Sequence, residues 1–167
     1  DGSAGMYLYH GDPVFGCVKM QDYLEVVKGF LDSNPNEIIL MTIEGGASTH
    51  RLDSMYNHAG LGSYQYDHTW GNSWPTLSEM INTGKRLVVL SDNGDAEDFD
   101  GFHGLWHYTV DVNYDIQDPA NFDCEYDRGN PSGDFYQLNH FVTIITPQQN
   151  SAQTINQYDY LYGRAVD

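Results

Sequence analysis

Hydrophobic residues near the start of the chain change their spacing twice, from a short run to a helical period and back to a run. Residues 6–9 form an apolar and aromatic run that ends at His10, which predicts a short buried strand. From Val18 to Asp32 apolar residues recur at helical spacing, and charged residues fall largely on the opposite face. Pro35 disfavours helical geometry at the residue before it, and residues 38–43 follow as an almost continuous apolar strand. The predicted apolar face of the helix comprises Val18, Tyr23, Leu24, Val27, Phe30 and Leu31.

This order of strand, helix and strand predicts a βαβ unit. His10 follows its first strand and Glu44 follows its second. Because the crossover makes the two strands parallel, their carboxyl ends share one edge of the sheet. Functional side chains of parallel sheets gather at that edge. The sequence therefore predicts a histidine and a carboxylate on the same face of the fold.

The next part of the chain is less regular. Residues 47–60 predict a short helix with Leu52 and Met55 on its apolar side. Residues 61–73 are rich in Gly, Tyr, His and Trp, which predicts a loop over the active face.

A second short helix has a clear start signal. Thr76 is followed three residues later by Glu79, which is the spacing of a capping box. Gly84 predicts the end of this helix, and residues 86–90 predict the next buried strand.

The last third of the chain predicts two strands and a helix. Residues 105–110 and 135–142 are the strand candidates, and residues 151–162 predict a terminal helix with Ser151 as its cap. The acidic stretch 92–100 does not match a calcium-binding EF-hand loop in any register, so it predicts a solvated loop. About five or six strands are expected in all.

The net charge of the chain disfavours some classes of binding partner. The chain has 24 acidic and 7 basic residues, giving a net charge of −17. Such a surface repels nucleic acid, and within a Debye length of ~10 Å at 0.1 M salt it also repels anionic lipid. Nucleic-acid binding is therefore disfavoured.

Composition favours an exported protein without a membrane span. Tyr, Gly, Asn and Asp are abundant and Lys is scarce, and no apolar run approaches the ~20 residues that a transmembrane helix needs. Cys17 and Cys124 would permit one disulfide in an oxidising compartment, or pairing with cysteines outside this segment. The alternative is two buried free thiols.

Several motifs together resemble the X-type catalytic domain of phosphatidylinositol-specific phospholipase C and its secreted relatives. They cover nearly the whole chain in the order of that family. The motifs are HG at 10–11, FLDSNPNEIILMTIE at 30–44, WPTL at 74–77, KRLVVLSD at 85–92, LWHY at 105–108, Cys124 with DRG at 127–129, and LNHF at 138–141.

The resemblance implies an α/β fold, a distorted TIM-type (β/α)8 barrel. Such a barrel usually needs roughly 250 residues, so the 167 residues are interpreted as a single partial domain with about strands 2–7. The absent first strand would carry another histidine. We expect the isolated segment to be inactive and poorly stable, because an incomplete barrel exposes sheet edges.

The resemblance also implies a chemistry. In the family one histidine removes a proton from an inositol hydroxyl, which attacks phosphorus to form a cyclic phosphate, and a second histidine protonates the departing diacylglycerol oxygen. His10 matches this second, general-acid histidine, and imidazole suits the role because its unperturbed pKa is about 6.5. The alternative is that His10 only hydrogen-bonds in a strand-end turn.

Glu44 matches a glutamate that binds Ca²⁺ in calcium-dependent relatives. Metal-independent bacterial relatives use a basic residue nearby instead. Carboxylate oxygen suits a hard cation, so Ca²⁺ is the cofactor considered, and no other is expected. The alternative is a strand-end carboxylate that caps a neighbouring loop.

Arg128 and His140 are candidates for substrate binding. Arg128 is one of the few cations that could meet a phosphate, with Lys85 and Arg86, although a loop salt bridge explains it equally well. His140 corresponds to a polar position near a late strand end, and its alternative is a hydrogen-bonded core histidine.

Two function classes therefore remain open. The first is an exported phosphodiesterase that cleaves a phosphoinositide, a glycosylphosphatidylinositol or a related diester, with peripheral contact to the membrane. The second is a noncatalytic member of the same fold that acts as a binding or surface protein.

Overall fold

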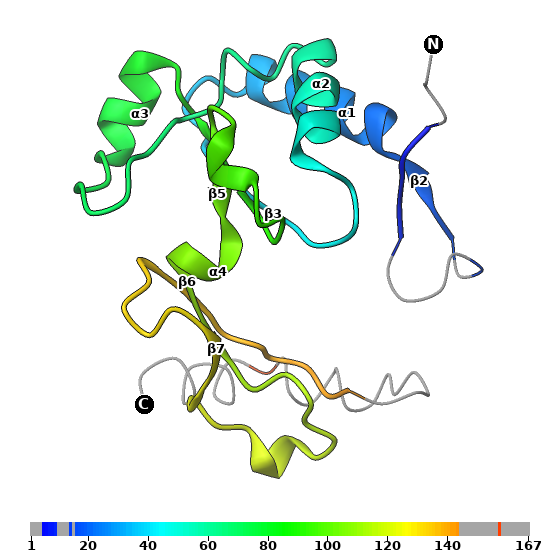
Figure 1. Ribbon diagram of the computed structural model, residues 1–167, viewed down its shortest axis with the longest axis vertical. Helices are drawn as coiled ribbons and strands as arrows, with labels where there is room; N and C mark the ends of the chain where they lie inside the picture. Colours follow the sequence, from blue (N-terminus) through cyan, green and yellow to red (C-terminus); the bar gives the residue numbers. More distant parts are fainter. Residues whose placement is uncertain (1–4, 10–13, 15, 144–156, 158–167) are drawn as a thin grey trace. The chain divides into compact units, whose positions relative to one another are not determined.

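A computed structural model describes residues 5–9, 14, 16–143 and 157 of the chain (Figure 1). The chain divides into two compact units, Asp1–Gly104 and Leu105–Asp167, called here the first and second unit. The first unit contains β1 (Tyr7–Leu8), β2 (Val18–Lys19), α1 (Met20–Ser33), β3 (Ile39–Ile43), α2 (Thr49–His58), α3 (Leu77–Thr83), β4 (Leu87–Ser91), the 3-10 helix η2 (Ala96–Asp98) and β5 (Phe102–Gly104). The second unit contains α4 (Leu105–Tyr108), β6 (Thr109–Val112), the 3-10 helix η3 (Pro119–Asn121), β7 (Tyr126–Gly129) and β8 (Phe135–Gln137).

A parallel sheet with the order β3-β4-β5 is the centre of the first unit. Met41 pairs with Val89, and Val89 pairs with Phe102 on its other side. All five residues of β4 are buried, as expected for a central strand. The predicted strands at 38–43 and 86–90 are confirmed to within one residue.

Helix α1 covers this sheet with one apolar face, as predicted. Its buried residues are Met20, Leu24, Val27 and Leu31, which pack in the same core as Leu87, Val89 and Phe102. Three members of the predicted face were placed wrongly: Val18 belongs to β2 and is exposed, and Tyr23 and Phe30 are 43% and 44% exposed. The stripe that is buried repeats every three or four residues from Met20, and Tyr23 and Phe30 lie beside it.

The first strand does not form the predicted βαβ unit. In the described residues β1 pairs with β2 in an antiparallel ladder, Tyr7 with Lys19 and Leu8 with Val18. A short connection permits an antiparallel hairpin, whereas parallel pairing needs a long crossover. The parallel crossover of the first unit instead joins β3 to β4 and contains α2 and α3.

Helix α2 confirms the prediction for residues 47–60, with Leu52 and Tyr56 fully buried. The loop that follows was placed wrongly in part. The Tyr66 amide donates to the Leu87 carbonyl at 2.8 Å, and the Leu87 amide donates to the Tyr64 carbonyl at 2.9 Å. This stretch therefore runs along the amino end of β4, opposite to the edge where strand ends carry function.

The capping box of α3 is confirmed. The Glu79 amide donates to Thr76 Oγ1 at 3.2 Å, and the Thr76 amide donates to Glu79 Oε2 at 2.8 Å. Gly84 ends the helix at φ +74°, a left-handed conformation that favours glycine.

The second unit has a mixed sheet with the order β7-β6-β8. Strand β6 is antiparallel to β7 and parallel to β8. The predicted strand at 105–110 is wrong for residues 105–108, which form α4, and only residues 135–137 of the predicted strand at 135–142 are strand. The predicted helix at 151–162 lies outside the described residues, except for residue 157.

The α/β class is confirmed, while the incomplete TIM-type barrel is not. The strands of the described residues form three separate sheets and no closed barrel.

Candidate functional site

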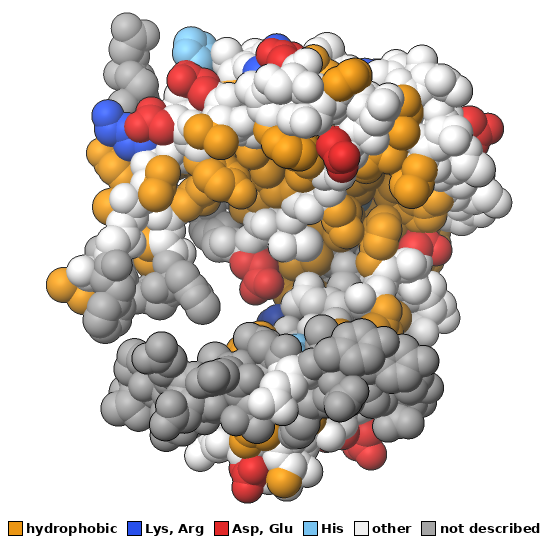
Figure 2. All heavy atoms as spheres, turned by 180° about the vertical axis from the view of Figure 1, so that it is seen from behind, with side chains coloured by type: hydrophobic (Ala, Val, Ile, Leu, Met, Phe, Trp, Pro, Cys, Tyr) orange, Lys and Arg blue, Asp and Glu red, His pale blue; other side chains and the backbone are white. Residues whose placement is uncertain are grey.

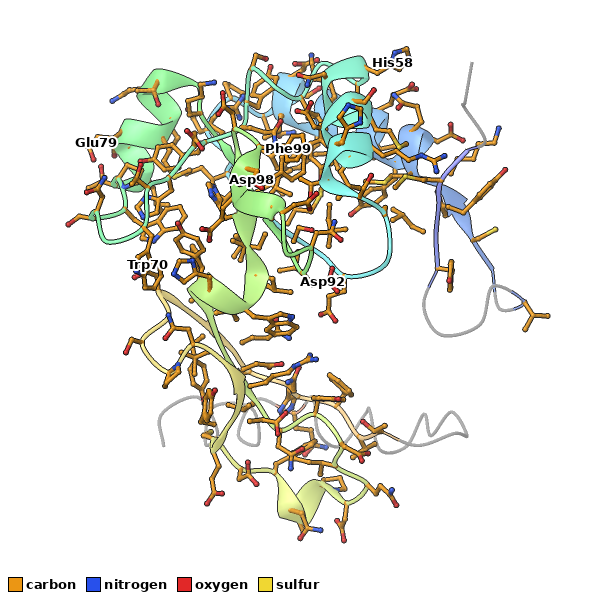
Figure 3. All side chains as sticks on the ribbon, in the orientation of Figure 1. His58, Trp70, Glu79, Asp92, Asp98 and Phe99 are labelled. Carbon is orange, nitrogen blue, oxygen red and sulfur yellow. The ribbon has the colours of Figure 1, made fainter. Side chains whose placement is uncertain are left out.

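The carboxyl edge of the parallel sheet brings two acidic residues together. Ile43, the last residue of β3, pairs with Ser91, the last residue of β4. Glu44 and Asp92 follow directly, so their backbones leave adjacent strands at the same edge. Figure 3 shows Asp92 at this end of the sheet, away from Glu79 on α3 and His58 on α2.

Asp92 holds the backbone on both sides of Glu44. Its amide donates to the Ile43 carbonyl at 3.1 Å. Its two carboxylate oxygens accept from the Gly45 amide, each at 3.1 Å. Gly45 has φ +127°, a conformation that side chains rarely adopt.

The loop after β4 makes two further side-chain bonds to the loop after β3. Asn93 Nδ2 donates to the Ala47 carbonyl at 2.5 Å. Thr49 Oγ1 donates to Asp95 Oδ1, and Thr49 is fully buried at the start of α2. The acidic stretch predicted to be a solvated loop therefore uses its first residues to hold the β3–α2 connection.

Glu44 itself is exposed and makes no hydrogen bond or ion pair to a described residue. It fits Ca²⁺ as one hard oxygen ligand, but Ca²⁺ takes six to eight oxygens. Among the described residues no three His, Cys, Asp or Glu side chains gather as a metal group. Figure 2 likewise shows acidic side chains spread singly over the visible face. Glu44 as a calcium ligand therefore stays a prediction.

A hollow of about 380 Å³ lies at the opposite, amino edge of the same sheet. Lys85 precedes β4 there and Asp100 precedes β5, and Asp53 and Asp67 also line it. It lies away from both Glu44 and Asp92.

His10 lies outside the described residues, so its role as general acid stays a prediction.

Arg128 occupies a strand and not a loop. It stands opposite Asp111 in the antiparallel pair β6–β7, and its Nε lies 2.7 Å from Asp111 Oδ2. The guanidinium carbon lies 4.0 Å from the ring centre of Trp106 and 4.5 Å from that of Tyr114. Asn139 Nδ2 donates to the other oxygen of Asp111 at 2.7 Å.

This arrangement corresponds to the salt-bridge alternative for Arg128. Asp111 is fully buried, so the ion pair and the amide satisfy a carboxylate that would otherwise be costly to bury. Sequence reasoning missed Asp111, although an acid within the apolar run Thr109–Val112 was a signal that it needed a partner.

His140 is half-buried, and its ring centre lies 5.4 Å from that of Phe122. It follows Asn139, which joins the Asp111 network. Substrate contact by His140 or Arg128 stays a prediction.

Two other cationic side chains, Arg86 and Lys28, bind protein groups within the first unit. Buried Arg86 donates to the carbonyls of Leu31, Asn34 and Glu37 at 2.8–2.9 Å, which satisfies the end of α1. Lys28 pairs with Asp32 at 2.7 Å on the surface of α1. Side-chain hydrogen bonding to Asp32 raises the pKa of Lys28.

His103, in β5, was not among the site residues predicted from the sequence. His103 is 1% exposed, its Nε2 lies 3.0 Å from the Tyr66 carbonyl, and the rings of His68 and Trp74 lie edge-on to it. Desolvation lowers the pKa of His103, which favours the neutral ring. His103 lies in β5 and His107 lies in α4, so these two histidines do not share a helix that would place both on one face as metal ligands.

Both cysteines are exposed and form no disulfide within the described residues. The alternative of two buried thiols is therefore wrong, and oxidation with another partner stays a prediction. No helix of the described residues is long and apolar enough to span a bilayer.

Comparison with known proteins decides the family. The family model PI-PLC X 1 matches residues 15–164. The chain belongs to the PI-PLC X family. Glu44, Arg128 and His140 lie within the matched residues, and His10 precedes them.

The chain is similar to fungal and plant proteins. A PI-PLC X domain-containing protein 1 of Arthroderma benhamiae is 32% identical over 135 residues, covering 75% of this chain and 44% of that protein. A PI-PLC X domain-containing protein of Arabidopsis thaliana is 33% identical over 95 residues, covering 53% of this chain and 22% of that protein. An uncharacterized secreted protein of A. benhamiae is 27% identical over 136 residues, covering 74% of this chain and 29% of that protein.

The chain thus spans less than half the length of these three proteins. No solved structure matches it.

Proposed function

We propose that this chain is part of a phosphoric diester hydrolase of the phospholipase C type. The observation that carries the proposal is the exposed carboxylate of Glu44 at the carboxyl end of β3, inside the residues that match the PI-PLC X family. The carboxyl edge of a parallel sheet is where such folds position reacting groups.

His10 is the proposed general acid. A second histidine, outside this chain, removes a proton from a ring hydroxyl of the substrate, and the resulting oxygen attacks phosphorus. A cyclic phosphate forms as the bond to the departing alkoxide breaks, and His10 donates its proton to that oxygen. An imidazole with a pKa near 7 is suited to this transfer.

Glu44 is proposed to hold Ca²⁺ with ligands outside the described residues. The bound ion would neutralise negative charge that develops on the phosphate and lower the pKa of the attacking hydroxyl.

The substrate class is a phosphoinositide, a glycosylphosphatidylinositol or a related diester. We propose that the protein is exported, in line with the relative that is named a secreted protein. Peripheral membrane contact is part of this proposal, with the net charge of −17 favouring surfaces of low anionic charge.

A noncatalytic binding or surface protein is the second candidate. It is favoured by the engagement of three of the scarce cations, since Arg128, Arg86 and Lys28 already have protein partners. A phosphate site built on these side chains would have to break those contacts.

Phosphorus NMR of phosphatidylinositol vesicles incubated with the complete protein distinguishes the phosphodiesterase from the noncatalytic protein. If the protein is a phosphodiesterase, a cyclic inositol phosphate should be the first product, and His10→Ala should reduce turnover about 10²–10⁴-fold. His58→Ala is the matched control, because His58 lies exposed at the end of α2 (Figure 3) and should leave turnover unchanged. Vesicle binding without cyclic phosphate, with or without Ca²⁺, would favour the noncatalytic protein.

Glu44→Gln tests the calcium role separately. It should weaken the dependence of turnover on Ca²⁺, while Glu37→Gln, at another exposed glutamate, should not. Full activity of the wild type after exhaustive chelation would remove this role.

A further inference from the structure

Asp92 brackets Glu44 through the backbone. The Asp92 amide bonds to the residue before Glu44, at the Ile43 carbonyl, over 3.1 Å. The Asp92 carboxylate bonds to the residue after Glu44, at the Gly45 amide, with both oxygens at 3.1 Å. Both peptide planes next to Glu44 are therefore held by one residue of the neighbouring strand end.

These contacts fix where the Glu44 side chain starts. The backbone on either side of Cα sets the direction in which a side chain leaves the chain. Two glycines follow Glu44 in the connection Glu44-Gly45-Gly46, so this backbone would be conformationally free if nothing held it. The bonds from Asn93 to Ala47 and from Thr49 to Asp95 hold the rest of the connection. An exposed carboxylate thus stands on a loop whose polar groups are tied to the end of β4.

We propose that Asp92 is a positioning residue. It orients the Glu44 carboxylate toward the Ca²⁺ that would bind beside the substrate phosphate. This inference rests on the proposed function. In this proposal Asp92 acts through the Gly45 amide, from which both of its carboxylate oxygens accept. Residues that orient a metal ligand typically change metal affinity or activity by about 10–100-fold when they are removed.

Two substitutions separate orientation from charge. Asp92→Ala removes the acceptor for the Gly45 amide, whereas Asp92→Asn keeps a carbonyl oxygen that can accept it while losing the negative charge. A positioning role predicts that Asp92→Ala weakens Ca²⁺ binding and that Asp92→Asn largely preserves it. A direct ligand role predicts that asparagine is nearly as harmful as alanine, since Ca²⁺ prefers carboxylate oxygen.

The experiment uses the complete protein and Ca²⁺ alone, with affinity measured by titration calorimetry. Asp92→Ala should weaken Ca²⁺ binding about 10-fold or more, and Asp92→Asn should stay within about 3-fold of wild type. Glu44→Gln should weaken it at least as much as Asp92→Ala. Asp98→Asn, at an exposed acid of η2 in the same acidic stretch, is the control for lost charge and should change nothing.

Hydrogen exchange of the Gly45 amide gives a readout that does not depend on activity. Protection should be lost in Asp92→Ala and kept in Asp92→Asn, and thermal unfolding identifies any variant that simply fails to fold. Wild-type affinity in a folded Asp92→Ala, or equal losses in the alanine and asparagine variants, would overturn the positioning role alone. Absence of both turnover and Ca²⁺ binding in the wild type would overturn the proposed function together with it.

Discussion

Two acidic residues of this protein, Glu44 and Asp111, differ in which of their groups the surrounding residues bind. At the carboxyl edge of the first unit, Glu44 is exposed, and only the backbone around it is held, by Asp92. In the second unit, Asp111 is fully buried, and its own oxygens are bonded by Arg128 and Asn139. The difference indicates that Asp111 serves folding, because a buried charge must be paired, while the described residues leave the Glu44 carboxylate exposed.

The largest expected effect on stability is at the buried pair. Arg128→Met leaves Asp111 buried with one partner fewer, so it should lower the free energy of unfolding by about 3 kcal/mol. Urea unfolding of the complete protein measures this. Arg128→Met combined with Asp111→Leu should recover part of the loss, since the unpaired charge is gone. A loss below about 1 kcal/mol in the single variant would contradict the role assigned to Asp111.

The first unit contains its own buried charge, at Arg86. Arg86→Met should lower the free energy of unfolding by about 2 kcal/mol, because the carbonyls of Leu31, Asn34 and Glu37 lose a charged donor. Lys85→Met, next to it but exposed, is the control and should have little effect. Similar small effects at both positions would show that the end of α1 is satisfied without Arg86.

A smaller, pH-dependent effect is expected at His103. Burial lowers its pKa below the ordinary 6.5, against the opposing influence of the Tyr66 carbonyl, Asp67 and Glu97, with His68 acting in the same direction as burial. The folded state therefore binds fewer protons than the unfolded state just below pH 6.5, so this stability is complete above that pH and is lost as pH falls through the folded-state pKa.

Urea midpoints between pH 7.5 and 5 measure the contribution of His103. His103→Gln should flatten the acid-side decline relative to wild type, while His58→Gln should leave it unchanged because His58 is exposed. An identical decline in His103→Gln would assign the pH dependence to other groups.

The sequence predicted the first unit better than the second, for physical reasons. Strands β3 and β4 are almost continuous apolar runs in the sequence, and the Thr76–Glu79 capping box is a local signal within four residues. Strand β7 is polar and half-exposed, so its pattern resembles a loop until its partner β6 is known.

The site shows the same limit. Glu44 was found because it directly follows an apolar strand. The hydrogen bond from the Gly45 amide to Asp92, which holds the backbone beside Glu44, joins residues 47 positions apart, and the Asp111–Arg128 pair spans 17 positions. Such pairings depend on strand order and register, which no local pattern encodes.

The smallest stability effect is expected at Glu44, and it sharpens the comparison with Asp111. Glu44→Gln should change the free energy of unfolding by less than about 0.5 kcal/mol, because an exposed side chain with no partner among the described residues contributes little to folding. Its effect should instead fall on Ca²⁺ dependence. A loss comparable to that of Arg128→Met would show that the two acids have the same role.

The central claim is that His10 donates a proton to the leaving oxygen during phosphodiester cleavage, and the measurement that tests it most directly varies the leaving group. Turnover of the complete protein, wild type and His10→Ala, is compared on phosphatidylinositol and on an inositol phosphodiester with an acidic aryl leaving group. His10→Ala should lower turnover of the natural lipid about 10²–10⁴-fold and that of the aryl ester much less, because an acidic leaving group needs little protonation. Equal losses on both substrates, or no turnover of either by the wild type, would contradict this account.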